Sequence, residues 1–342
     1  MDPTEELITS YYELNGSHIE ELGDADGVGI EPSPLEFMRH VARNSPFVVR
    51  GGADVWPAVM TWSVPVLRKL LSSHTVNVAV TPNGRADAPT RITTDDGQHK
   101  TVFAKPHEED QNFAELLDFI IRQEAGEPVG ETRYAQTQND NLRNEYAAVF
   151  PHVPRDIPFA RIALDRLPEA VNLWIGNSHS VTAMHRDNYE NIYVQVLGQK
   201  HFVLLPPLCQ PCVNEQLLQP FTYEREDADG GGRHRTQLSL VQDEEELDEP
   251  DGAGDYVPFA LWDPDRPDEN KTAYSHLAQP MRVTLDPGDM LYLPAMWYHK
   301  VSQSTSKEGV CVAVNYWYDM DFTGPLVPLT SFVRAIHQKA PV

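Results

Sequence analysis

The sequence predicts a mainly β protein with flanking helices, built around a barrel or a sandwich. From Arg133 onward, short β-rich runs follow one another and are separated by Gly, Pro and Asn. Residues 1–130 alternate helical and extended patterns instead. No stretch approaches the roughly 18 consecutive apolar residues that a membrane span requires. The sequence therefore favours a β core with a helix-containing region in front of it.

Residues 1–130 are predicted to form a helix and strand region that packs on the barrel. Ser33 suits the N-cap of a helix and Pro34 suits its first position, and the apolar residues that follow recur at helical spacing. This indicates a helix over residues 33–43. The other elements predicted here are helices over 64–72 and 113–124 and strands over 46–51 and 76–80.

Residues 131–342 are predicted to form the β core, and the two regions together make one functional unit. Gly198 and Gln199 lie between two extended runs and suit a hairpin turn. A short helix is predicted over residues 329–337. The predicted strands cover residues 133–136, 171–176, 181–185, 190–197, 200–205, 281–285, 290–293 and 310–318.

An acidic insertion at 224–270 interrupts this core. It holds sixteen acidic and four basic residues, which account for half of the chain's net charge of −24. Its composition predicts a solvated loop. A docking surface for a basic partner is the alternative interpretation.

The overall charge and the cysteines indicate which partners the protein can bind and in which cellular compartment it is expected. Acidic residues outnumber basic ones 51 to 27, so the chain repels phosphate backbones and is expected to bind no nucleic acid. The acidic N-terminus lacks the apolar region of a signal peptide. Of the three cysteines, Cys209 and Cys212 form a CxxC without a second pair for zinc. We expect a cytoplasmic protein, with the nucleus as a second compartment, that is neither secreted nor bound to membranes.

The chemistry is predicted to lie in a His-x-Asp motif, His185 and Asp187, between two predicted strands. Far downstream, a Pro-Gly-Asp turn leads into a strand that precedes His299. Two histidines and one carboxylate can occupy one face of an octahedral ion and leave three positions open, as is typical of non-haem Fe(II) oxygenases. A narrow barrel can make the two segments neighbours. We therefore predict that His185, Asp187 and His299 bind Fe(II), form the catalytic centre and admit dioxygen.

Two similar motifs lack this context. His18-x-Glu20 lies in a polar stretch, and His107-x-Glu109 lies in a charged one that is expected to be a loop. Since a short motif alone is a weak signal, the strand pattern around His185 distinguishes it from both, and no metal site is predicted at either.

The open metal face suits a bidentate 2-oxo acid such as 2-oxoglutarate as co-substrate. Its far carboxylate would lie inside the barrel and would need a cation or several donors. Lys200, which opens the strand after the Gly198 turn, can supply the ammonium; a surface lysine in a hairpin is the alternative interpretation. The predicted co-substrate site consists of Lys200, Thr182, Tyr134, Asn191 and Asn315.

The segments that carry these residues resemble the jumonji-C (JmjC) oxygenases of the cupin superfamily. Residues 172–176, 185–191 and 200–207 carry the resemblance, and residues 288–299 resemble the family's second motif. The resemblance covers most of the chain, from residue 33 to residue 318. Residues 134–139 and 171–174 are similar to a small stand-alone member of the family.

This resemblance implies a double-stranded β-helix, the jelly-roll barrel of the cupins, flanked by helices. It implies Fe(II) at His185, Asp187 and His299, and 2-oxoglutarate at the five residues named above. It also implies (3S)-lysyl hydroxylation of a developmentally regulated GTP-binding protein, by an enzyme that forms a homodimer. A peptidase activity on histone-like tails is a second activity that it suggests.

Two other functions remain open from the residues. The same three ligands could hold zinc in a metal-dependent peptidase that acts on basic tails. A non-catalytic acidic cupin could serve as a binding module for a basic partner. Histone demethylases fit less well, because three cysteines cannot build the zinc modules that they usually carry.

Overall fold

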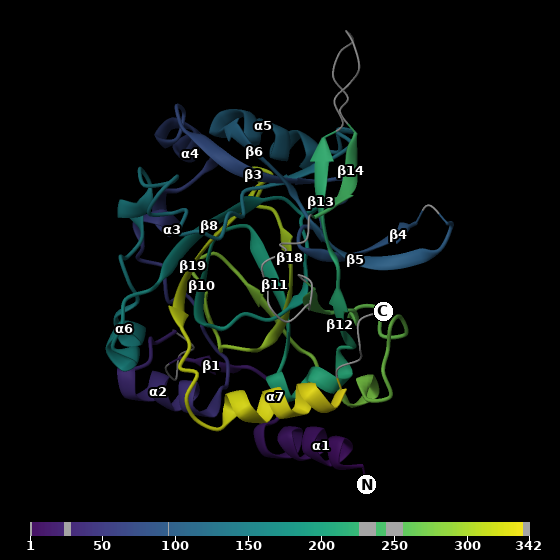
Figure 1. Ribbon diagram of the computed structural model, residues 1–342. Coiled ribbons are helices and arrows are strands. Elements are labelled where there is room, and N and C mark those ends of the chain that lie inside the picture. The colour runs from purple at the N-terminus through teal and green to yellow at the C-terminus, as the bar shows by residue number, and fades with distance from the viewer. Residues whose placement is uncertain (1, 24–28, 95, 226–236, 244–255, 338–342) are drawn as a thin grey trace.

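Two facing β-sheets form the barrel at the centre of the molecule (Figure 1). The computed structural model describes residues 2–23, 29–94, 96–225, 237–243 and 256–337. Within these residues, one sheet has the strand order β1-β2-β17-β10-β19-β8 and the other has the order β16-β11-β18-β9. The predicted double-stranded β-helix is confirmed. Its strands are β8 (Ala170–Gly176), β9 (Thr182–His185), β10 (Tyr189–Leu197), β11 (Gln199–Leu205), β16 (Met281–Leu285), β17 (Met290–Leu293), β18 (Tyr298–Ser304) and β19 (Cys311–Asp319).

The sequence of β10 shows how one strand serves both a core and a site. Because side chains alternate between the two faces of a strand, Ile192 and Val194 point to one face and Asn191 and Tyr193 to the other. Ile192 and Val194 are fully buried in the main hydrophobic core. Asn191 and Tyr193 line the cavity inside the barrel. A slip of one residue would exchange the two sets, so the buried core fixes the register that places polar groups in the cavity.

The helices of the N-terminal half cover the outer face of the larger sheet (Figure 1). The predicted capping of one of them is present: Ser33 and Glu36 form a reciprocal capping box, and Pro34 is the first helical residue. Phe37 of this helix is fully buried against Phe47 and Tyr292. The elements on this side are α2 (Pro34–Arg43), α3 (Pro57–Thr61), α4 (Val64–Leu70), α5 (Phe113–Glu124) and α6 (Pro158–Leu164), with β1 (Glu20–Leu22) and β2 (Phe47–Val49) extending the sheet.

Three smaller sheets lie outside the barrel, and each contributes residues to the lining of the cavity within it. One pairs β3 (Thr75–Thr81) with β6 (His107–Asn112) and β7 (Thr132–Tyr134). Another has the order β14-β13-β5-β4, and the third pairs β12 with β15. The strands of these two sheets are β4 (Ala88–Thr93), β5 (His99–Lys105), β12 (Glu215–Leu218), β13 (Pro220–Arg225), β14 (Leu238–Gln242) and β15 (Val257–Ala260).

The first and last helices lie side by side at the bottom of the view in Figure 1. These are α1 (Pro3–Asn15) and α7 (Leu326–His337), and the hydroxyl of Thr4 lies 3.1 Å from Nε2 of His337. Beside them run the 3-10 turns η2 (Pro207–Cys212) and η3 (Ser275–Leu277), while η1 (Phe150–His152) lies elsewhere in the chain. Cys209 and Cys212 are buried and free in η2.

The structure corrects several expectations about single elements. His107 and Glu109 belong to strand β6 rather than to a loop. Within the acidic insertion at 224–270, residues 238–242 and 257–260 are strands, while 226–236 and 244–255 lie outside the described residues. The boundary at residue 131 between an N-terminal region and a core stays a prediction. Among the described helices, none is long and apolar enough to cross a membrane.

Candidate metal and co-substrate site

The barrel encloses a cavity of about 580 Å³ that is lined by every residue predicted for the site. These residues come from β7, β9, β10, β11, β18 and β19 and from the turn after β9. They are Tyr134, Thr182, His185, Asp187, Asn191, Lys200, His299 and Asn315.

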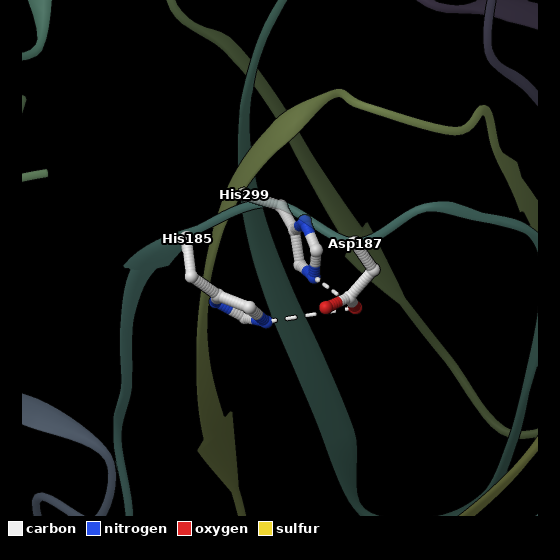
Figure 2. A group of neighbouring side chains, drawn as sticks. All are labelled: His185, Asp187 and His299. Carbon is white, nitrogen blue, oxygen red and sulfur yellow. Dashed lines mark ion pairs between the residues drawn. The ribbon is translucent and has the colours of Figure 1, made fainter. Parts of the chain in front are cut away.

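Strand pairing brings the two distant histidines together. His299 of β18 is the register partner of His185 of β9, although 113 residues lie between them in the chain. Their ring centroids are 4.1 Å apart. Asp187 lies two residues after the end of β9. Its carbonyl accepts a 2.7 Å hydrogen bond from the backbone N–H of Met296, which links the two segments. Oδ2 of Asp187 lies 3.7 Å from Nε2 of His185 and 3.6 Å from Nε2 of His299 (Figure 2).

Backbone carbonyls fix the tautomer of both rings. Nδ1 of His185 lies 2.8 Å from the carbonyl of Ala183, and Nδ1 of His299 lies 3.0 Å from the carbonyl of Trp297. A carbonyl can only accept, so each Nδ1 carries the proton and donates it. Both Nε2 lone pairs therefore face Asp187 and are free for a metal ion. One ligand atom from each of the three residues lies within 4.8 Å of the others, so the group could hold an ion.

The electrostatics of this group favour the ligand-competent forms of His299 and Asp187. Burial lowers the pKa of His299 to about 4, helped by the neighbouring His185. Burial opposes ionisation of Asp187, but the two histidines outweigh it and lower its pKa to about 2. Burial also disfavours the charged form of His185, yet Asp187 more than offsets this and raises its pKa. At neutral pH the site thus offers a neutral His299 and an ionised carboxylate.

Lys200 is a buried cation at another part of the same cavity. Its side chain is 3% exposed, and Nζ donates a 2.9 Å hydrogen bond to the hydroxyl of Tyr134. Burial raises the pKa of Tyr134, so its hydroxyl is neutral and does not balance the ammonium. Within the described residues no carboxylate lies within 4.0 Å of Lys200. A buried charge of this kind requires an anion.

The strand register shows how far this cation lies from the histidines. On β11, Leu204 is the partner of His299 and Lys200 lies four residues earlier. Both positions therefore point to the same face, and at about 3.3 Å per residue they are about 13 Å apart along the strand. The cavity thus has a metal-ligand group at one level and a buried ammonium deeper along the same wall.

The remaining predicted residues complete the lining between these two levels. Asn315 donates a 3.1 Å hydrogen bond to Asn191 and accepts one of 3.0 Å from the indole N–H of Trp174. Thr182 opens strand β9, opposite Val301 of β18. These contacts hold the amide groups in fixed orientations in the cavity wall.

Other cavity residues were not predicted. Tyr193 lies near Lys200, and the alternation of β10 beyond Asn191 was the signal that could have found it. Gly176 allows Tyr134 to approach, because a Cβ there would lie 2.6 Å from the Tyr134 ring. Glu215 accepts hydrogen bonds from Tyr298 and Arg334, which link helix α7 to the cavity. No local sequence pattern signals that link, since it depends on tertiary packing.

A double-stranded β-helix with two histidines and an aspartate inside defines a cupin-type metal-binding protein. The cupin-like domain family matches residues 32–324. The human protein JMJD7, described as a bifunctional peptidase and (3S)-lysyl hydroxylase, is 37% identical over 292 residues, which are 85% of this chain and 83% of that protein. JMJ32 of Arabidopsis thaliana, described as a lysine-specific demethylase, is 38% identical over 304 residues, 85% of this chain and 81% of that protein. JmjC domain-containing protein E of Dictyostelium discoideum is 29% identical over 301 residues.

The chain therefore belongs to the JmjC family of cupin-like proteins, the 2-oxoglutarate-dependent oxygenases. Dependence on Fe(II) and 2-oxoglutarate is a property of that family, and the His-Asp-His group lies where the barrel could hold the ion. The enzyme class predicted from the sequence, a 2-oxoglutarate-dependent dioxygenase, is confirmed.

Proposed function

We propose that this enzyme hydroxylates a lysine of a protein substrate, with Fe(II) at His185, Asp187 and His299 and 2-oxoglutarate between the metal and Lys200. One observation carries the proposal: a metal-ligand group lines the same cavity as a buried ammonium that has no anionic partner among the described residues. Two imidazoles and one carboxylate match the donor set that suits Fe(II). The far carboxylate of 2-oxoglutarate is the anion that Lys200 requires.

When bound, Fe(II) and 2-oxoglutarate supply the oxidising chemistry by activating dioxygen. The residues of this chain bind and orient. The Nδ1 hydrogen bonds of His185 and His299 aim both Nε2 atoms at one point. Lys200 and the hydroxyl of Tyr134 hold the far end of the co-substrate, with Thr182, Asn191 and Asn315 along its length. The barrel wall excludes water from the reacting groups.

The substrate part of the proposal is a lysine, hydroxylated at C3 in the (3S) configuration, in a developmentally regulated GTP-binding protein. The name of the human relative supports the reaction, because it describes a (3S)-lysyl hydroxylase. The net charge of −24 supports a basic substrate, since an acidic surface attracts a lysine-rich segment and raises its association rate.

Peptide mass spectrometry tests this function. A developmentally regulated GTP-binding protein is incubated with the enzyme, Fe(II), 2-oxoglutarate and air, beside an otherwise identical reaction with His185→Ala. We expect one added oxygen on a lysine in the first reaction and none in the second. Succinate formation without any oxidised lysine would show that the substrate is wrong. Cleavage that needs no 2-oxoglutarate would favour a peptidase, the other activity in the name of the human relative.

We also propose that the enzyme forms a homodimer through α7. This helix buries Thr330 and Val333 but leaves Leu329, Phe332 and Ile336 exposed at 39%, 63% and 59%. Their spacing places them on one side of the helix. An apolar stripe of this kind is suited to a copy of itself across a two-fold axis.

Phe332→Asp is expected to convert the dimer to a monomer, because it would bury a charge at the centre of the stripe. The mass in solution, measured by light scattering after gel filtration, should fall by half. The matched control is Leu35→Asp, which changes an exposed residue of another helix, α2 (64% exposed), and should leave the mass unchanged. A monomeric wild type, or the dimer mass in Phe332→Asp, would contradict the interface.

A further inference from the structure

Two carboxylates from outside the barrel also line the cavity that holds the metal-ligand group. Asp87 directly precedes β4, and Glu108 lies in β6. Asp87 is close enough to His185 and to Glu108 for their charges to interact. One part of the cavity wall is therefore acidic, whereas the wall around Lys200 is cationic.

Within the described residues neither carboxylate has an ion-pair partner within 4.0 Å. Glu109, the neighbour of Glu108, does have one, because Nε of Arg225 lies 2.6 Å from its carboxylate. Asp87 is half-buried, and its side chain accepts a 3.2 Å hydrogen bond from the amide of Gln136. A half-buried carboxylate that lines a cavity and has no ion-pair partner among the described residues is suited to a cationic ligand.

The backbone holds Asp87 in an uncommon conformation. Its φ is 50°, in the left-handed region that most residues avoid at a cost of about 1 kcal/mol. Asp and Asn tolerate this region better than other residues with side chains. The backbone conformation, and not only the side-chain rotamer, therefore determines where the carboxylate lies. The amide of Gln136, itself a cavity residue, fixes it further.

We infer that Asp87, together with Glu108, binds the ammonium group of the target lysine and so determines the specificity of the reaction. This inference rests on the proposed lysyl hydroxylation and goes beyond it by naming the residues that recognise the side chain. In lysine the ammonium nitrogen is four bonds from C3. A carboxylate that holds the nitrogen beside the metal group therefore selects which carbon faces the metal, and it rejects side chains without a positive charge.

The test compares two peptides. One carries the lysine that the wild-type enzyme oxidises, and the other carries norleucine, which has the same carbon chain without the amine, at that position. Binding of both to the iron-loaded enzyme with 2-oxoglutarate is measured by titration under nitrogen, and KM is measured in air. The variants are Asp87→Asn, Glu108→Gln and their combination. Asparagine keeps the left-handed backbone available and removes only the charge.

The wild type is expected to prefer the lysine peptide by about 10- to 100-fold, as for a charge-assisted hydrogen bond in a partly buried site. Asp87→Asn should lower this preference most, and the combined variant should bring it close to one. The control is Asp110→Asn. Asp110 lies two residues after Glu108 in β6, is exposed, and does not line the cavity. Since it removes an equal charge, it separates contact from long-range attraction.

An unchanged preference in the combined variant would overturn the inference while leaving lysyl hydroxylation intact. If the combined variant lost affinity for both peptides equally, the inference would also be overturned, because that result indicates a structural defect and not recognition of the amine. If Asp110→Asn lowered the preference as much as Asp87→Asn, recognition by contact would be wrong. If the wild type oxidised no lysine at all, the proposed function would fail, and this inference would fail with it.

Discussion

Asp187→Ala is expected to reduce 2-oxoglutarate turnover by at least about 100-fold. The substitution removes the one carboxylate of the metal-ligand group and leaves two imidazoles, which hold Fe(II) less firmly. The fold should persist, because the backbone bond from Met296 to the carbonyl of Asp187 does not need the side chain. Succinate formation, bound iron and thermal unfolding measured on the same preparation separate loss of the site from loss of the fold.

The control for this prediction is Glu20→Ala. Glu20 belongs to the similar motif His18-x-Glu20, but it is exposed and lies outside the cavity. We expect wild-type iron content and turnover from this variant. Wild-type turnover in purified Asp187→Ala would refute the role of the metal-ligand group.

Lys200→Met is expected to raise the KM for 2-oxoglutarate by about 10- to 100-fold, because the far carboxylate would lie buried without a cation. Methionine keeps a similar length and removes the charge. Iron binding without co-substrate should be unaffected, because Lys200 lies about 13 Å along the strand from the level of His299. The co-substrate-free variant should unfold at the same temperature as the wild type or higher, since an unbalanced buried ammonium costs stability.

A second co-substrate makes this prediction specific. For a 2-oxo acid of the same length without the far carboxylate, the KM values of the wild type and Lys200→Met should differ much less than they do for 2-oxoglutarate. Lys307→Met removes an exposed lysine and serves as the charge control. A wild-type KM in Lys200→Met would show that the buried ammonium serves the fold and not the co-substrate.

The barrel could be predicted because its strands carry local signals. The runs over 281–285 and 290–293 coincide with β16 and β17, and the helix over 113–124 coincides with α5, where apolar spacing is clear. The helix α1 was missed because its sequence is polar and buries only Ile8 and Tyr12. The strand β6 was missed because its residues His107–Asn112 are all polar or charged, so pairing with β3 and not burial makes it extended.

The metal-ligand residues could be predicted from the sequence, but not every residue that lines the cavity. His185, Asp187 and His299 carry a donor set with a recognisable spacing and strand context, and the structure brings them together. Lys200 had two interpretations in the sequence, and its burial favours the one inside the barrel. Asp87 lies outside the predicted elements and reaches the cavity through a left-handed turn. A position that depends on such a turn leaves no pattern in the sequence.

The most direct test of lysyl hydroxylation uses isotopically heavy dioxygen. The enzyme, Fe(II), 2-oxoglutarate and a developmentally regulated GTP-binding protein react under this gas in ordinary water, and the lysine-containing peptides are weighed together with the succinate formed. A dioxygenase predicts one heavy oxygen on the lysine, one in succinate, and equal amounts of the two products. Ordinary oxygen taken up from water at a cleaved peptide bond, without succinate, would contradict hydroxylation and indicate a hydrolase in its place.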